Sequence, residues 1–393
     1  MKRICILLLA LAIWAAGYAK ESDSAWTGTW AAAAEFTGPS DMPKASLSNR
    51  SLREIVKVSI GGTSLRLQLS NEFSKEPVEI RSIYIADGSE TWTIDTKTAR
   101  YLTFNGKRNV TIEPGKAIFS DVVKYNLKPL QRLAITINYG AQTPVNATSH
   151  RGSRTTSYII EGTSKPKTSF ENGERADHWY NIAAIDVLAD EQTPCVAVIG
   201  NSITDGRGST TNKQNRWPDF MAEAFGGQTA VLNLGIGGNC VLESGLSEPA
   251  LVRFDRDILG QRGVKTLIIF EGVNDIGWSS GQAERKSQRL IDAYKTLIEK
   301  ARAKGMRVYM GTITPFKGNS YFKPFQEAAR QVVNEWIRTT DLIDGVIDFD
   351  KAVRNESDTM QLKAEYSDDW LHLNPAGYEA MGKVAAQTLS ANK

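Results

Sequence analysis

The chain has 393 residues, 41% hydrophobic and 23% charged, a composition typical of globular proteins with room for about two domains. Its formal net charge is only +3, and no dense Lys/Arg run occurs beyond Lys2-Arg3, so the composition argues against nucleic acid as a partner. Three cysteines and three histidines are too few and too scattered for a disulfide framework or a zinc site. We expect neither a metal nor another cofactor.

Residues 1–19 predict a secretory signal peptide. Lys2-Arg3 precede an apolar stretch, Ile4 to Ala19, which ends in the small-residue cleavage pattern Gly17-Tyr18-Ala19. A membrane span needs about 20 apolar residues, so this stretch is too short, and no second one occurs later in the chain. We therefore expect no transmembrane segment, and export to the periplasm or the exterior of a bacterial cell.

Strand-like patterns dominate residues 24–190. Residues 55–60 and 65–69 alternate apolar and polar side chains, and Gly61-Gly62 lies between them, which predicts a β-hairpin. Further short apolar runs follow at intervals marked by turns such as Asn105-Gly106. This pattern predicts an all-β domain, sandwich or jelly-roll-like, over 24–190.

The pattern changes to alternating strands and helices over residues 191–393. Trp217, Phe220, Met221, Ala224 and Phe225 have helical spacing and are followed by Gly226-Gly227, a typical helix end. Short apolar runs between helical segments predict a parallel sheet covered by helices on both faces. The predicted strands include residues 196–199, 230–234 and 267–270, and further helical patterns cover 282–304 and 323–340.

A serine stands directly after the first of these predicted strands. Ser202 lies in Gly200-Asn201-Ser202-Ile203-Thr204-Asp205-Gly206, and the chemistry of open α/β sheets collects outside the carboxyl ends of the strands. Taken alone, the turn fits a helix N-cap as well as a nucleophile. Residue 204 is Thr, so the Gly-x-Ser-x-Gly elbow of α/β-hydrolases is absent.

Three later segments supply the groups that a nucleophilic serine requires. His372 has Asp369 three residues before it, and a serine hydroxyl needs such a base, whose tautomer a carboxylate fixes. The loop containing Gly238 and the amide of Asn274 both follow predicted strands and can donate to a developing oxyanion, together with the Ser202 N–H. The predicted catalytic set is therefore Ser202, His372, Asp369, Gly238 and Asn274.

The order Ser202, Gly238, Asn274, His372 resembles the signature of the SGNH hydrolases, also called GDSL-type esterases. The similarity covers residues 194–390. Two positions depart from the family pattern without removing a catalytic atom: Asn201 replaces the usual Asp, and Leu373 stands where Pro is frequent. Finer matches, similar to the XynE-like secreted arylesterases and acylhydrolases, are Arg216-Trp217-Pro218-Asp219, Arg253-Phe254-Asp255-Arg256-Asp257 and Thr312-Ile313-Thr314-Pro315-Phe316.

The resemblance implies a flavodoxin-like catalytic domain preceded by a β domain. It also implies a cofactor-free serine esterase acting on short acyl, most of all acetyl, esters of plant cell-wall polysaccharides or oligosaccharides, with an acylated glycan or small ester as its substrate. Two alternatives stay open: a generalist aryl or lipid esterase, and a catalytically idle carbohydrate-binding protein.

Three smaller expectations concern single side chains. We expect Cys195 and Cys240 to be buried free thiols, because they stand at opposite ends of the sheet. His178 is expected to tie the two domains together. Tyr321-Phe322, in a loop after the fourth strand, could form a wall of the substrate pocket.

Overall fold

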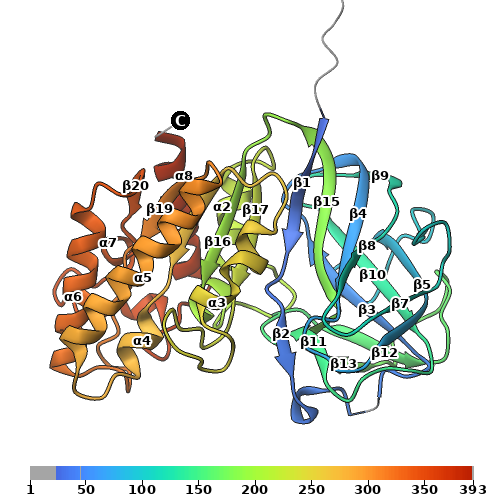
Figure 1. The fold of residues 1–393 in the computed structure, drawn as a ribbon, viewed down its shortest axis with the longest axis horizontal. Coiled ribbons are helices and arrows are strands. Elements are labelled where there is room, and N and C mark those ends of the chain that lie inside the picture. The colour runs from blue at the N-terminus through green and yellow to red at the C-terminus, as the bar shows by residue number, and fades with distance from the viewer. Residues whose placement is uncertain (1–23, 45, 392–393) are drawn as a thin grey trace, which may run out of the picture.

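The computed structural model describes residues 24–391 except residue 45, so the predicted signal peptide lies outside the described residues. An all-β part is followed by an α/β part, and the two lie side by side with β1 (Ser24–Ala31) next to β17 (Ala230–Gly235) (Figure 1). No helix in this described portion is long and apolar enough to cross a membrane.

The N-terminal part consists of antiparallel sheets, which confirms the prediction of an all-β fold ahead of the α/β part. One five-stranded sheet has the order β1-β15-β4-β8 with β9 on β4, a seven-stranded sheet has β13-β12-β3-β10-β5-β6 with β7 on β5, and a small sheet has β14-β11-β2. The strands not yet given are β2 Glu35–Thr37, β3 Arg50–Lys57, β4 Gly62–Ser70, β5 Val78–Asp87, β6 Arg100–Leu102, β7 Val110–Ile112, β8 Ala117–Phe119, β9 Val123–Leu127, β10 Arg132–Tyr139, β11 Ala147–His150, β12 Ser157–Glu161, β13 Glu174–Ala176, β14 Trp179–Tyr180 and β15 Ile182–Asp190, with a 3-10 turn at Pro39–Asp41.

The predicted hairpin around Gly61-Gly62 is wrong. β3 pairs with β10 and β12, whereas β4 pairs with β15, β8 and β9, so the chain crosses from one sheet to the other between them. Ser59 N–H donates to the Thr29 carbonyl of β1, and the Leu127 carbonyl and Pro129 leave no space for a Cβ at Gly61. The glycines therefore allow close packing at a sheet-to-sheet crossover, a role that the alternating pattern does not distinguish from a hairpin turn.

The C-terminal part has a parallel five-stranded sheet in the order β17-β16-β18-β19-β20, and this confirms the predicted flavodoxin-like fold. One helical layer contains α3, α4, α5 and α6, and another contains α2, α7 and α8 (Figure 1). The remaining strands are β16 Cys195–Gly200, β18 Thr266–Phe270, β19 Arg307–Gly311 and β20 Gly345–Ile347. The helices are α1 Ser202–Asp205, α2 Trp217–Ala224, α3 Ala250–Phe254 with a π turn at Asp255–Leu259, α4 Val273–Gly277, α5 Ala283–Ala303, α6 Pro324–Thr339, α7 Phe349–Val353 and α8 Pro375–Ala391, with a 3-10 turn at Ala364–Tyr366.

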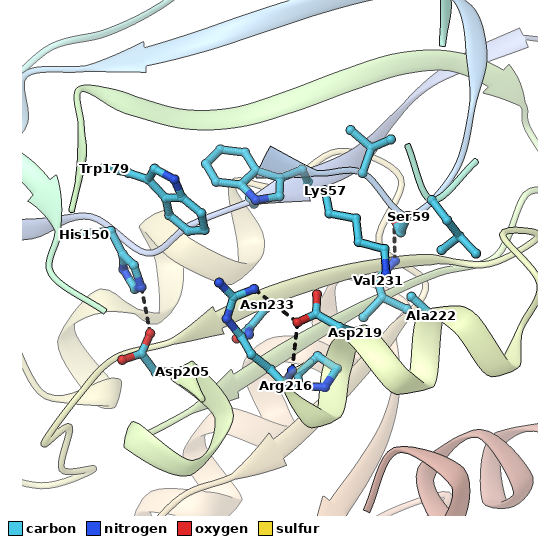
Figure 2. A pocket seen from close by; sticks show the side chains of 15 residues that line it. Lys57, Ser59, His150, Trp179, Asp205, Arg216, Asp219, Ala222, Val231 and Asn233 are labelled. Atoms are coloured by element: carbon cyan, nitrogen blue, oxygen red, sulfur yellow. Dashed lines mark hydrogen bonds and ion pairs between the residues drawn. The ribbon is translucent and has the colours of Figure 1, made fainter. Parts of the chain in front are cut away.

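Hydrogen bonds join the two parts along their common face. Gly28 N–H of β1 donates to the Arg262 carbonyl at 3.0 Å, and Val231 N–H of β17 donates to Ser59 Oγ at 3.0 Å. Figure 2 shows the second of these bonds beside Lys57, whose ammonium pairs with Glu223 of α2. The two parts therefore share a polar as well as an apolar interface.

Among the three minor expectations, one is corrected. The His178 ring stacks on Tyr180 of the same domain at 5.7 Å between centroids, so His178 does not tie the domains together. That contact is made by His150 at the end of β11, whose Nε2 lies 2.8 Å from Asp205 Oδ1 in α1 (Figure 2). Cys195 and Cys240 are both buried free thiols.

Candidate active site

Ser202 is the first residue of α1, directly after β16, and its side chain opens on a cavity at the carboxyl edge of the sheet. The N-cap is Asn201, not Ser202: the Asn201 side-chain oxygen accepts from Ile203 N–H at 3.0 Å. Because the Asn201 side chain caps the N-terminus of the helix, the Ser202 hydroxyl is not needed as a cap and can bond to another group. The side chain of Asn201 in turn donates to Glu271 at 3.2 Å.

That partner is His372. Ser202 Oγ lies 2.8 Å from His372 Nε2, and His372 Nδ1 lies 2.7 Å from Asp369 Oδ2. The other Asp369 oxygen accepts from the backbone N–H groups of Leu371 at 3.0 Å and His372 at 2.8 Å, which fixes the carboxylate in the turn before α8. Burial opposes ionisation of Asp369, but the hydrogen bonds from the His372 side chain and backbone outweigh it and lower the pKa of Asp369. The carboxylate stays ionised and orients the ring.

Asn274 and Gly238 line the same cavity as Ser202. Asn274 Oδ1 accepts from the Tyr321 hydroxyl at 3.0 Å, while Nδ2 donates one of its two hydrogens to the Asn239 carbonyl at 2.8 Å. This leaves the second Nδ2 hydrogen available. The N–H groups of Ser202 and Gly238 donate to no other group in the described part of the chain. Three donors are thus free to serve a ligand at this edge of the sheet.

A buried arginine ties the supporting loops to the strands. Arg253 of α3 donates to the Gly200 carbonyl at 3.1 Å, to the Leu234 carbonyl at 2.8 Å and to Asn239 Oδ1 at 2.9 Å. These bonds satisfy the ends of β16 and β17 and orient Asn239, the residue whose carbonyl holds Asn274. Asn239 and Arg253, which do not line the cavity, therefore help to set the donor position of the amide.

Glu271, which follows β18, is fully buried behind Ser202. Its Oε1 has no hydrogen-bond partner among the described residues and lies 3.6 Å from the Arg253 guanidinium. Burial raises the pKa of Glu271 to about 8, and Arg253 and the bond from Asn201 only partly oppose this. The carboxyl is therefore protonated at neutral pH.

More than half of the cavity wall comes from residues that the sequence reasoning did not select. The cavity has a volume of about 320 Å³, and the β domain contributes Glu35, Arg151, Gly152 and Arg154 to its wall. A Cβ at Gly152 would collide with the Asp205 carboxylate, so only glycine lets this segment approach α1 so closely. The signal was present as the cationic run Ser149-His150-Arg151-Gly152-Ser153-Arg154 in an otherwise strand-like region. The α/β part adds Arg207, Leu246 and Trp278, as well as Tyr321, the aromatic expected as a possible pocket wall.

His150 links the two domains, and its neighbours favour its charged form. Its Nε2 faces Asp205 at 2.8 Å and its Nδ1 faces the Ala33 carbonyl at 3.0 Å, and both partners only accept hydrogen bonds. Burial lowers the pKa of His150, but Asp205, Glu35 and the Ala33 carbonyl raise it by more.

Within the described residues, no cluster of three or more His, Cys, Asp or Glu side chains could hold a metal ion.

Comparison with known proteins assigns a family to the C-terminal part of the chain. Residues 198–380 match the sequence profile of the GDSL-like Lipase/Acylhydrolase family. A stretch of 146 residues is 31% identical to the uncharacterized lipoprotein YqeF of Bacillus subtilis (strain 168), covering 34% of this chain and 56% of that relative. The C-terminal domain is therefore a GDSL-like lipase/acylhydrolase domain of the SGNH family.

Solved structures with a similar fold include two of stated activity or family. A GDSL-like lipase from Bacteroides thetaiotaomicron VPI-5482 is 18% identical with a TM-score of 0.40, covering 52% of this chain and 91% of that one. A catalytic mutant of an acetylxylan esterase from Geobacillus stearothermophilus is 18% identical with a TM-score of 0.38, covering 49% of this chain and 93% of that one.

Proposed function

We propose that the protein is a serine esterase that hydrolyses short-chain acyl esters, in particular acetyl esters on carbohydrates. The observation that carries the proposal is the continuous line of contacts from Ser202 Oγ to His372 Nε2 and from His372 Nδ1 to Asp369, with the three free donors beside it. This is the arrangement that acyl transfer through a serine requires.

In the proposed reaction, Ser202 Oγ attacks the ester carbonyl carbon while His372 Nε2 takes the hydroxyl proton. The negative oxygen of the tetrahedral intermediate accepts hydrogen bonds from the N–H groups of Ser202 and Gly238 and from Asn274 Nδ2. His372 then gives its proton to the leaving alcohol, and the acyl group remains on Ser202. Water, deprotonated by His372, releases the acid and restores the hydroxyl.

The lining of the cavity favours a short acyl group and a polar alcohol. Leu246, Trp278 and Tyr321 are its only large apolar side chains among the described residues, so no long apolar groove is available for a fatty acyl chain. Trp278 is 47% exposed at the cavity, where its ring can stack on a sugar. The arginines that line the same cavity suit hydroxyl-rich substrates.

The test is the release of acid from a graded set of esters: 4-nitrophenyl esters of increasing acyl length, acetylated xylan and acetylated pectin, each with the full protein and with Ser202→Ala. We expect the highest kcat/KM for acetyl esters and none with Ser202→Ala. A preference for long acyl chains would indicate a generalist lipid esterase instead. Glycan binding without any ester turnover would indicate a carbohydrate-binding protein.

We further propose that residues 1–19 direct export, as their sequence pattern predicts. The mature protein is then expected to start near Lys20, and N-terminal sequencing of the protein recovered outside the cytoplasm tests this. A protein that retains its first residues and stays with the cytoplasmic fraction would contradict it.

A further inference from the structure

The cavity that contains Ser202 carries more positive than negative charge. Its carboxylates are Glu35 and Asp205, and its guanidinium groups belong to Arg151, Arg154 and Arg207. Glu35 and Arg151 neutralise one another, since the Arg151 side chain donates to Glu35 at 3.1 and 2.6 Å. Once this pair is set aside, the cavity has two guanidinium groups, those of Arg154 and Arg207, and one carboxylate, that of Asp205.

The carboxylate of Asp205 already has a partner, the His150 ring of the β domain. Asp205 lies 2.8 Å from His150 Nε2, whereas its contact with Arg154 Nη2 is 3.4 Å long. His150 is therefore the closer partner of Asp205, and the guanidinium of Arg154 is only weakly compensated. Arg207 is exposed at the cavity, and its side chain makes no hydrogen bond or ion pair with another described residue.

Arg154 is also held in a costly conformation. Its φ is 50°, in the left-handed region that non-glycine residues rarely adopt, and Asn212 N–H fixes its carbonyl at 2.9 Å. Its Nε is buried without a hydrogen-bond partner among the described residues. A buried donor that lacks an acceptor destabilises the protein, so this guanidinium is not fully compensated by its own surroundings.

We propose that Arg154 and Arg207 bind a carboxylate on the substrate, so that the preferred substrates are acyl esters of acidic sugars, such as acetylated uronic acid residues. This inference rests on the proposed esterase function and adds its substrate class. Guanidinium groups match carboxylates through parallel N–H donors. The β domain thus contributes Arg154 to the proposed carboxylate site, and the α/β domain contributes Arg207 together with the catalytic groups.

A matched pair of substrates tests the proposal. Acetylated oligogalacturonate is compared with the same oligosaccharide after methyl esterification of its carboxyl groups, and only released acetate is measured. We expect kcat/KM to be at least about tenfold higher for the free acid. This preference should shrink near 1 M salt, where the screening length is about 3 Å.

Variants of Arg154 and Arg207 test whether these two residues cause the preference for the free acid. Arg207→Gln and Arg154→Gln should each move the ratio of the two kcat/KM values toward one, and Arg154→Lys should restore only part of it because the fork geometry is lost. Arg207 is exposed, so its variant is expected to fold even if Arg154→Gln does not. Arg108→Gln, at an exposed arginine of the β domain beyond this cavity, is the control and should keep the full ratio.

The outcomes separate this inference from the proposed function. If 4-nitrophenyl acetate and both oligosaccharides are all left intact, the esterase function itself is wrong. If the aryl acetate is hydrolysed but free acid and methyl ester react equally, or if the Arg207→Gln ratio equals that of the control, the carboxylate site is overturned.

Discussion

Ser202 and His372 should act as one unit, because the hydroxyl and the ring share a proton across a 2.8 Å contact. Ser202→Ala and His372→Ala are each expected to reduce kcat for 4-nitrophenyl acetate to near background, and the double variant should be scarcely worse. Ser357→Ala, at an exposed serine with no side-chain bond to another described group, is the control and should be fully active. Full activity of Ser202→Ala would refute the nucleophile, and multiplicative losses would refute the shared role.

The amide of Asn274 should act mainly in the transition state, since the oxyanion it faces exists only there. Asn274→Ala is expected to lower kcat by about 10²–10³-fold with little change in KM. If KM rises while kcat is unchanged, the Asn274 amide binds the substrate before the reaction, and its proposed role as an oxyanion donor is wrong.

Tyr321 positions that amide through its 3.0 Å hydrogen bond. Tyr321→Phe keeps the ring and is expected to lower kcat roughly three- to tenfold, in line with the loss of one hydrogen bond. In the double variant with Asn274→Ala, Tyr321→Phe should lower kcat no further, because Tyr321 acts only by holding the Asn274 amide. Tyr101→Phe in β6 is the control. Additive losses in the double variant would show that Tyr321 acts independently of Asn274.

At the scale of single elements, the end of β18 contains a group that links stability to pH. The pKa of Glu271 is raised to about 8 from 4.5, so between these values the folded state holds a proton that the unfolded chain has released. The free energy of unfolding therefore contains a term that falls as the pH rises from about 4.5 to 8. Its size is at most about 5 kcal/mol, at about 1.4 kcal/mol per unit of pKa.

Glu271→Gln should remove that term. Urea unfolding at about pH 5, 7 and 9 is expected to show that the variant gains stability relative to the original protein as the pH rises. Glu299→Gln, at an exposed position of α5, is the control and should follow the original protein. A constant difference between Glu271→Gln and the original protein across this range would contradict a raised pKa.

At the scale of the whole molecule, His150 and Lys57 make interdomain ion pairs that differ in burial. The His150 side chain is 5% exposed and its partner Asp205 2%, whereas Lys57 is 11% exposed and Glu223 44%. His150→Ala leaves a buried carboxylate with only the long Arg154 contact, and we expect a loss of about 1–3 kcal/mol. Lys57→Met should cost at most about 1 kcal/mol. Thermal unfolding followed by circular dichroism measures both, and equal losses would argue against His150 as the main polar link.

The sequence determined the α/β half and its site to a large extent. Parallel strands place their carboxyl ends at one edge, so residues that directly follow successive apolar runs, such as Ser202, Gly238 and Asn274, are predicted to meet there. Asp369 and His372 are close in sequence, and a turn is enough to bring them together. These relations are local or follow from the periodicity of the sheet, and such information is contained in the order of residues.

Only the tertiary structure decided how the β strands pair and what the β domain adds to the cavity. The alternation of apolar and polar side chains in residues 55–60 and 65–69 is compatible with a hairpin and with a crossover between sheets. The alternation determines which side chains share a face of a strand, but it does not determine which other strand pairs with it. His150 and Arg154 reach Asp205 of α1, three residues after Ser202, because two domains pack against each other. That contact depends on shape and charge across surfaces far apart in the chain, for which no local spacing carries a signal.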